Sequence, residues 1–231
     1  MKTPLLSIIV PVYNEANTIK GIIEKINSVN IDKEIIVVDD ASSDGTSKAL
    51  SEIKSENIRV FRHDKNRGKG GAIVTGLAGA RGKFVIPQDA DREYNPRDLP
   101  ALVGYAVNNN LSVVYGSRFL KGRGLTSLSH YLGNKFLTGL TNILFNASLT
   151  DMETCYKLVS SDLMKELNIR AERFEVEPEI TAKILKKGYK IAEIPVSYHP
   201  RYYSEGKKIS WKDGISSIWC LIRLRLTKGH P

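Results

Sequence analysis

The chain contains 231 residues, 42% of them hydrophobic, which is enough to bury the core of one large α/β domain. Lys and Arg number 34 against 25 Asp and Glu, and the net charge of +9 favours an anionic partner: nucleotide phosphates, a lipid surface or nucleic acid. Two cysteines without CxxC spacing exclude a disulfide framework and a structural zinc site, and so indicate the cytosol.

Short apolar runs alternate with amphipathic stretches along the first half of the chain. The run at 5–10 is too short for a signal peptide, so we interpret it as a buried strand. Because these runs are hydrophobic throughout, they predict an α/β fold with a mostly parallel, Rossmann-like sheet flanked by helices. The expected strands are 5–10, 34–40, 58–63, 82–89 and 111–117, and the expected helices are 15–29, 46–55, 71–80 and 96–108.

The second half of the chain is less regular and ends in a basic tail. It predicts helices at 132–145 and 174–188, a strand at 190–200 and an amphipathic helix over 209–226. Glu175, Glu177 and Glu179 either line a pocket or favour the positive N-terminus of their helix. Seven bases against two acids lie in 200–231, so we expect one domain over 1–208 and an amphipathic basic segment over 209–231.

Polar clusters follow three of the expected strands. The segment PVYNE, residues 11–15, follows the first strand, Asp39 and Asp40 end the second, and Asp89 and Asp91 follow the fourth. Ligands of open parallel α/β sheets bind outside the carboxyl ends of the strands, so these clusters are expected to converge at one edge. The alternative for any one cluster is a turn that ends a strand.

Asp89 and Asp91, separated only by Ala90, predict a metal site. Two carboxylates at this spacing can share a hard divalent cation, Mg²⁺ or Mn²⁺, which keeps coordination positions open for diphosphate oxygens. Glu93 is a candidate third ligand. The alternative is a solvated acidic turn.

A glycine-rich segment, NRGKGGAIVTG at 66–76, opens the third expected helix. Its backbone N–H groups and Lys69 can surround a phosphate. The spacing fits neither the GxxxxGK[ST] loop nor the GxGxxG fingerprint, so a helix start that needs only flexible glycines is the alternative.

Five segments follow one another along the chain: SIIVPVYNEANTI, EIIVVDDASSDGT, NRGKGGAIVTG, QDADREYNP and VVYGSRF. Together they resemble the family 2 glycosyltransferases of the GT-A fold, and most of all the dolichyl- or polyprenyl-phosphate sugar synthases. The resemblance runs from Ser7 to Phe119, and LTDMETCYKL, RFEVEPEITAKI and EGKKISWKDG extend it to about Ile215. It implies transfer of a hexose from a nucleotide diphosphate sugar to a polyprenyl phosphate, with inversion.

The resemblance also implies roles for individual residues. The DxD segment is expected to bind the metal and the diphosphate, and Asp91 and Arg118 are the expected catalytic residues. The residues expected to bind the nucleotide are Pro11, Tyr13, Glu15, Asp39, Asp40, Asp89 and Ala90, together with Lys69 from the glycine-rich segment. The residues expected to hold the metal are Asp89, Asp91 and Glu93.

The identity of the donor stays open at this point. Relatives that use mannose often carry Gln two residues after the DxD pair, where this chain has Glu93. GDP-mannose, the donor of dolichyl-phosphate mannose synthases, is nevertheless the donor that the resemblance implies, and UDP-glucose or another UDP-sugar is the alternative.

The acceptor of such a reaction is a phosphomonoester, which is largely anionic at neutral pH because its second pKa is about 6. No strong general base is then required, but positive charge must hold two anionic substrates together. Arg suits bidentate phosphate contacts and Lys suits a point-charge contact. The candidates are Arg118, Arg201, Lys207 and Lys208, of which Arg118 directly follows a strand.

The basic tail suggests how a lipid acceptor is reached. Trp219 and its apolar neighbours, with Arg223 and Arg225, form the mixture expected of a helix on an anionic membrane, and packing against the core is the alternative. The protein is thus expected to be cytoplasmic and peripheral at the cytoplasmic face of the membrane, docking directly or through a membrane-protein partner. Clustered acids at the ligand edge argue against the competing class, nucleic-acid binding.

Overall fold

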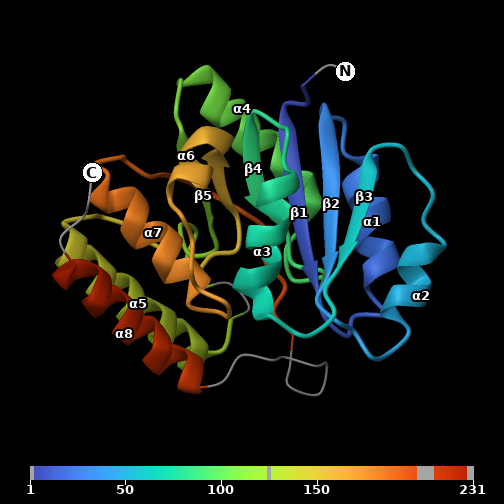
Figure 1. Ribbon diagram of the computed structural model, residues 1–231. Coiled ribbons are helices and arrows are strands. Elements are labelled where there is room, and N and C mark those ends of the chain that lie inside the picture. Colours follow the sequence, from blue (N-terminus) through green and yellow to red (C-terminus); the bar gives the residue numbers. More distant parts are fainter. Residues whose placement is uncertain (1–2, 124–125, 202–210, 228–231) are drawn as a thin grey trace.

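The computed structural model describes residues 3–123, 126–201 and 211–227. Within them, seven strands form one sheet in the order β3-β2-β1-β4-β6-β5-β7 (Figure 1). The strands are β1 (Leu6–Val12), β2 (Lys33–Asp39), β3 (Ile58–Arg62), β4 (Phe84–Pro87), β5 (Val113–Ser117), β6 (Lys157–Ser160) and β7 (Ala192–Pro195).

The sheet is mostly parallel, as the apolar runs predict. β1 pairs in parallel with both β2 and β4, and β2 does so with β3. The exception is β6, which the sequence did not predict and which runs antiparallel to β4 and β5. Since the strand order reverses between β1 and β4, the crevice beyond their carboxyl ends is where an open α/β sheet binds its ligands.

Helices cover both faces of the sheet (Figure 1). α1, α2 and α4 pack on one face, and α3, α6 and α7 pack on the other. Ile8 and Ile9, neighbours on β1, point to opposite faces and are both fully buried. The helices are α1 (Ile19–Ser28), α2 (Thr46–Ser51), α3 (Gly68–Gly79), the 3₁₀ turn η1 (Pro96–Asp98), α4 (Leu99–Asn108), α5 (Leu128–Phe145), α6 (Ser161–Glu166), α7 (Val176–Lys186) and α8 (Trp211–Leu226).

α5 and α8 lie side by side at one end of the molecule, against α7 (Figure 1). Cys220, Leu221 and Leu224 of α8 are buried in a third apolar cluster with Leu149. One face of the C-terminal helix therefore packs on the rest of the protein, while Trp219 on its other face is exposed. No helix of the described residues is long and apolar enough to cross a membrane.

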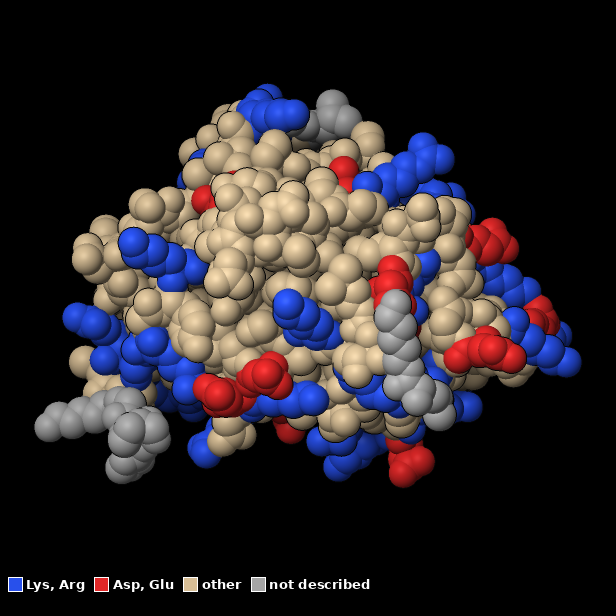
Figure 2. Space-filling model, turned by 90° about the horizontal axis from the view of Figure 1, so that it is seen from above, with Lys and Arg blue, Asp and Glu red and all other residues tan. Residues whose placement is uncertain are grey.

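The surplus of positive charge is spread over the surface. On the face seen from above, Lys and Arg lie in several separate groups around the edge, interleaved with Asp and Glu (Figure 2). The charge distribution on this face therefore does not locate a site, and the carboxyl edge of the sheet is the better guide.

Candidate active site

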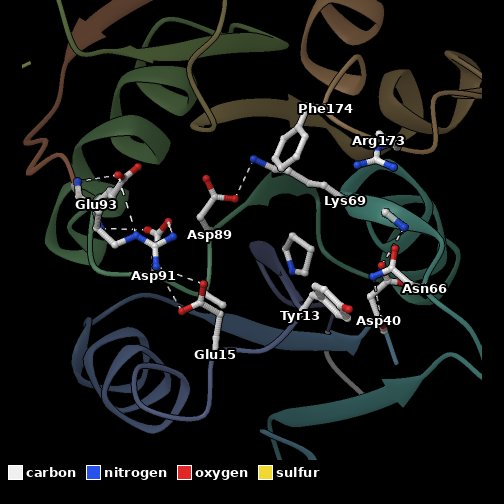
Figure 3. Close-up of a pocket in the computed structure, with 14 residues that line it drawn as sticks. Tyr13, Glu15, Asp40, Asn66, Lys69, Asp89, Asp91, Glu93, Arg173 and Phe174 are labelled. Atoms are coloured by element: carbon white, nitrogen blue, oxygen red, sulfur yellow. Dashed lines mark hydrogen bonds and ion pairs between the residues drawn. The ribbon is translucent and has the colours of Figure 1, made fainter. Parts of the chain in front are cut away.

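The predicted polar clusters converge on a cavity of about 290 Å³ at the carboxyl ends of β1, β2 and β4 (Figure 3). Glu15, Asp91 and Glu93 gather at one end of this nucleotide cavity, and Asp40 lies at the other. The predicted residues that line it are Pro11, Tyr13, Glu15, Asp40, Lys69, Asp89, Ala90, Asp91, Glu93 and Arg201. The structure thus brings together residues from five segments that are far apart in the sequence: 11–15, 40, 69, 89–93 and 201.

Asp40 shapes the nucleotide cavity by fixing the start of α3. Its carboxylate accepts hydrogen bonds from the backbone N–H groups of Arg67, at 2.8 Å, and Gly68, at 2.7 Å, and it lies 2.7 Å from Nδ1 of His63. Gly68 has a φ of +79°, and a Cβ there would lie 2.3 Å from the carbonyl oxygen of Glu172. The glycine-rich segment is therefore held close to the 170–174 loop, which only glycine permits at this position.

Asp39 lies next to Asp40 but does not line the cavity. Its carboxylate accepts hydrogen bonds from the backbone N–H of Ser42 and the hydroxyl of Ser47. Asp39 thus stabilises the turn between β2 and α2 from inside the protein. Asp39 can therefore affect nucleotide binding only indirectly, by holding this turn in place.

Asp89, the first aspartate of the DxD pair, is held by Lys69. Nζ of Lys69 lies 2.7 Å from Oδ1 of Asp89 and 3.0 Å from Oε1 of Glu177. Burial alone would lower the pKa of Lys69, but Asp89 in particular holds it well above its ordinary value. Lys69 is therefore a permanent cation beside the DxD pair, and it is bound to carboxylates in this structure.

Arg201 lies at the end of the nucleotide cavity where Glu15, Asp91 and Glu93 gather. Its guanidinium lies 2.8 Å from Oδ2 of Asp91 and 3.2 Å from Oε1 of Glu15. The structure thus joins the segment after β7 to the polar clusters that follow β1 and β4.

Glu93 anchors the segment that carries Arg201. Its Oε1 accepts the backbone N–H of Arg201 at 2.7 Å, and its Oε2 accepts the hydroxyl of Tyr198 at 3.0 Å. Both oxygens of this predicted third metal ligand are thus engaged with the protein. Lys207 and Lys208, predicted to bind the acceptor phosphate, lie outside the described residues.

Asp89 and Asp91 are the carboxylates best placed to hold a metal. Within the described residues, no three His, Cys, Asp or Glu side chains form a complete metal-binding group. Burial, with the charges of Asp89 and Glu93, nevertheless raises the pKa of Asp91 to about 7 despite the opposing effect of Arg201. Asp91 is therefore only partly ionised near neutral pH, and a cation bound beside it would favour the ionised form. The oxygen ligands at this end of the cavity fit Mg²⁺ or Mn²⁺, provided that a diphosphate and water complete the coordination.

A second cavity, of about 450 Å³, adjoins the first and shares Lys69, Asp89, Glu93 and Phe174 with it. We call it the acceptor cavity. α5 and α8 form part of its wall, and residues from the ends of β5 and β7 complete it. Two adjoining cavities that share Asp89 of the DxD pair suit a reaction between two substrates.

Arg118 lies in the acceptor cavity and not in the nucleotide cavity. Its Nε and one Nη each lie 2.7 Å from an oxygen of Asp151, and that Nη also donates to Asn134 at 3.0 Å. The rings of Phe119 and Tyr198 each lie 5.1 Å from the guanidinium carbon. Arg118 is thus fixed in place, and the fully buried Asp151 balances its charge.

Sequence patterns missed several polar residues of this region. Glu153 lines the acceptor cavity, and the fully buried Lys157 donates to the carbonyl of Met152 and lies 3.7 Å from Glu177. Both belong to DMETCYKL, which contributed to the family resemblance, but no local periodicity marks them as functional. The sequence left open whether Glu177 lines a pocket or only favours the N-terminus of its helix, and in the structure it lines the acceptor cavity.

Comparison with known proteins identifies the family. The family model described as Glycosyl transferase family 2 matches residues 7–167, well over half of the chain. The protein is a family 2 glycosyltransferase. This finding confirms the predicted enzyme class.

Two curated relatives of this glycosyltransferase come from archaea. A UDP-N-acetylglucosamine–dolichyl-phosphate N-acetylglucosaminyltransferase of Methanococcus voltae is 27% identical over 99% of both chains. The low-salt glycan biosynthesis hexosyltransferase Agl6 of Haloferax volcanii is 28% identical over 96% of this chain, which spans 53% of that protein.

Solved structures confirm the predicted GT-A fold of the glycosyltransferase. Glucosyl-3-phosphoglycerate synthase from Mycobacterium tuberculosis superposes with a TM-score of 0.75 at 20% identity, covering 98% of this chain and 80% of that one. TarS of S. aureus superposes with a TM-score of 0.65 at 19% identity, covering 95% of this chain and 64% of that one. At these identities the likeness establishes the fold and leaves the substrates to be argued from the site.

Proposed function

We propose that this glycosyltransferase transfers a hexose from a nucleotide diphosphate sugar to the phosphate of a polyprenyl lipid such as dolichyl or undecaprenyl phosphate. The observation that carries the proposal is the pair of adjoining cavities, one bounded by the DxD pair and the other by Arg118 and the helices α5 and α8. The archaeal relative named for transfer to dolichyl phosphate, which matches over its whole length, supports the same acceptor class.

The donor occupies the nucleotide cavity in this proposal. A cation shared by Asp89, Asp91 and the diphosphate would stabilise the charge on the leaving phosphate as a Lewis acid. The synthase from Mycobacterium tuberculosis was crystallised with UDP and either Mn²⁺ or Mg²⁺, which supports a divalent ion. Lys69 holds Asp89 in position and adds positive charge beside the diphosphate.

A UDP-sugar is the donor that we propose. The Methanococcus voltae relative is named for UDP-N-acetylglucosamine, and the structures of the synthase and of TarS contain UDP. GDP-mannose, the donor that the family resemblance implied first, has no such support among these relatives. Glu93 stands where mannose-using relatives often carry Gln, which agrees with this choice.

The acceptor phosphate enters the second cavity as an anion, so the protein needs to position it more than to deprotonate it. Lys69 and Arg118 are the Lys and Arg residues that line that cavity within the described chain, and Arg201 lines the nucleotide cavity beside Glu93, which both cavities share. In-line attack by the phosphate oxygen on the face opposite the leaving diphosphate inverts the anomeric centre.

An apolar face on α5 and α8 supports a lipid acceptor. On α5, Leu132 is 57% exposed, Phe136 62% and Ile143 82%, and on α8 Trp219 is 66% exposed and Leu226 78%. Apolar side chains on two packed helices suit the interface of a membrane, which removes them from water. A membrane-protein partner is the alternative occupant of this face.

The location of this face explains how a long lipid reaches the site. α5 and α8 bound the acceptor cavity with their inner sides and present apolar residues on their outer sides. Arg223 and Arg225, both exposed near the end of α8, add charge for anionic headgroups. We therefore propose that the enzyme binds the cytoplasmic face of the membrane as a peripheral protein, with α8 forming part of its contact.

One experiment tests the proposal directly. Purified protein is incubated with UDP-N-acetylglucosamine, UDP-glucose or GDP-mannose, Mn²⁺ and a polyprenyl phosphate, and the lipid products are identified by mass spectrometry. We expect one hexose or N-acetylhexosamine to be added to the lipid phosphate from a UDP-sugar. Transfer only to a water-soluble phosphate, or no transfer from any donor, would contradict the proposal.

A further inference from the structure

The wall of the acceptor cavity contains a buried carboxylate oxygen to which no described residue donates a hydrogen bond. Glu153 lies on the loop before β6, and its Oε1 is buried without receiving a hydrogen bond from the residues that the structure describes. Buried polar atoms are almost always hydrogen-bonded, and an exception in a cavity wall calls for an explanation. A ligand that donates a hydrogen bond to this oxygen would explain the exception.

The cations near Glu153 are engaged elsewhere. Lys157 donates to the carbonyl of Met152 and lies 4.2 Å from the centre of the Tyr115 ring, and Arg118 is bound to Asp151. The acids Glu177 and Asp151 are also near and repel it. Burial raises the pKa of Glu153 to about 7 despite the opposing effect of Lys157. The packed side chains therefore leave its hydrogen-bonding capacity unused.

The place of Glu153 suggests which ligand uses this capacity. Its charged neighbours include Arg118, proposed to face the acceptor phosphate, and Glu177, which pairs with Lys69 beside the DxD pair. The hexose must lie between the two phosphate sites during transfer. Glu153 lines the acceptor cavity, whose wall includes both Arg118 and Asp89 of the DxD pair.

We propose that Glu153 binds a hydroxyl group of the donor hexose and thereby selects among sugars. This inference rests on the proposed function and adds a specificity-determining residue to it. A site built to hydrogen-bond a hydroxyl rejects the analogue that lacks it, because the buried acid is then left unpaired. A donor deoxygenated at the contacted position should therefore bind poorly.

The test separates binding of the sugar from binding of the nucleotide. UDP, and the UDP-hexose that turns over best in the assay above, are titrated by calorimetry into the unmodified protein, Glu153→Ala, Glu153→Gln and the control Glu56→Gln. Glu56 is exposed on the loop before β3. We expect Glu153→Ala to lose about tenfold or more in affinity for the UDP-hexose and none for UDP, with the control unchanged.

Deoxy donors then identify the hydroxyl. One UDP-deoxyhexose of the series should bind the unmodified protein about tenfold more weakly, and the same analogue should bind Glu153→Ala with no additional loss. Equal losses in both proteins, or a Glu153→Ala that loses UDP and UDP-hexose equally, would overturn the inference. If Glu153→Ala does not fold, Glu153→Leu takes its place in the comparison, because Leu fills a similar volume and cannot accept the hydrogen bond, whereas Gln still can.

The inference and the proposed function fail in different ways. If the unmodified protein binds no UDP-hexose, both are wrong. If it transfers sugar to the lipid while Glu153→Gln and Glu153→Ala keep the sugar preference of the unmodified protein, the proposed function holds and Glu153 is not a specificity residue.

Discussion

Replacing Glu153 with Gln should make the stability of the fold less dependent on pH. Burial raises the pKa of Glu153 to about 7, against an ordinary value of 4.5. An acid whose pKa is higher in the native state binds its proton more tightly when folded, so the free energy of unfolding falls as the pH rises through this window. At about 1.4 kcal/mol per pH unit the full loss is about 3 kcal/mol, most of which falls between about pH 5 and pH 8.

Urea unfolding of the unmodified protein and of Glu153→Gln, at about pH 5 and pH 8, measures this effect. The free energy of unfolding of Glu153→Gln should rise relative to that of the unmodified protein by about 2 kcal/mol between the two pH values. This is less than the full effect because the side chain of Glu153 is partly exposed to solvent. The exposed Glu56→Gln variant should show no such rise. A stability difference of the same size at both pH values would refute the reasoning that Glu153 is buried without compensation.

Three further predictions concern the metal site, a buried ion pair and the membrane face. Asp91→Ala should lower sugar transfer about a hundredfold or more, with an unchanged circular dichroism spectrum, and retained activity would remove its metal role. Asp151→Ala should destabilise the fold by about 3–5 kcal/mol in urea, because it leaves the Arg118 charge buried and unpaired. Phe136→Glu should weaken sedimentation with anionic liposomes about tenfold. Val107→Glu, at an exposed apolar position on α4, should not weaken it. Equal liposome binding by both variants would exclude the α5 face as the membrane contact.

The first half of the fold could be predicted because its signals are local. Hydrophobic runs with polar ends mark the strands, and parallel strands bring their carboxyl ends to one edge, so PVYNE, Asp40 and the DxD pair were expected to meet. The opposite orientations of Asp39 and Asp40 also follow from strand geometry, since neighbouring side chains point to opposite faces. The family resemblance nevertheless predicted nucleotide binding for both aspartates.

The remaining features depend on contacts between distant segments. β6 has four residues and is defined by its pairing with β4 and β5, which no local pattern reveals. The pairing of Arg201 with Asp91 joins residues 110 positions apart. Glu153 becomes recognisable only when the cavity around it, and its missing partner, are seen.

The central claim is that the DxD pair holds the donor diphosphate through a divalent cation. Calorimetric titration of UDP into the unmodified protein and into Asp89→Ala, each with Mn²⁺ and with excess chelator, tests it most directly. We expect the chelator to weaken UDP binding to the unmodified protein about tenfold or more, and to leave the already weak binding to Asp89→Ala unchanged. Equally tight binding of UDP by the unmodified protein with and without Mn²⁺ would contradict the claim.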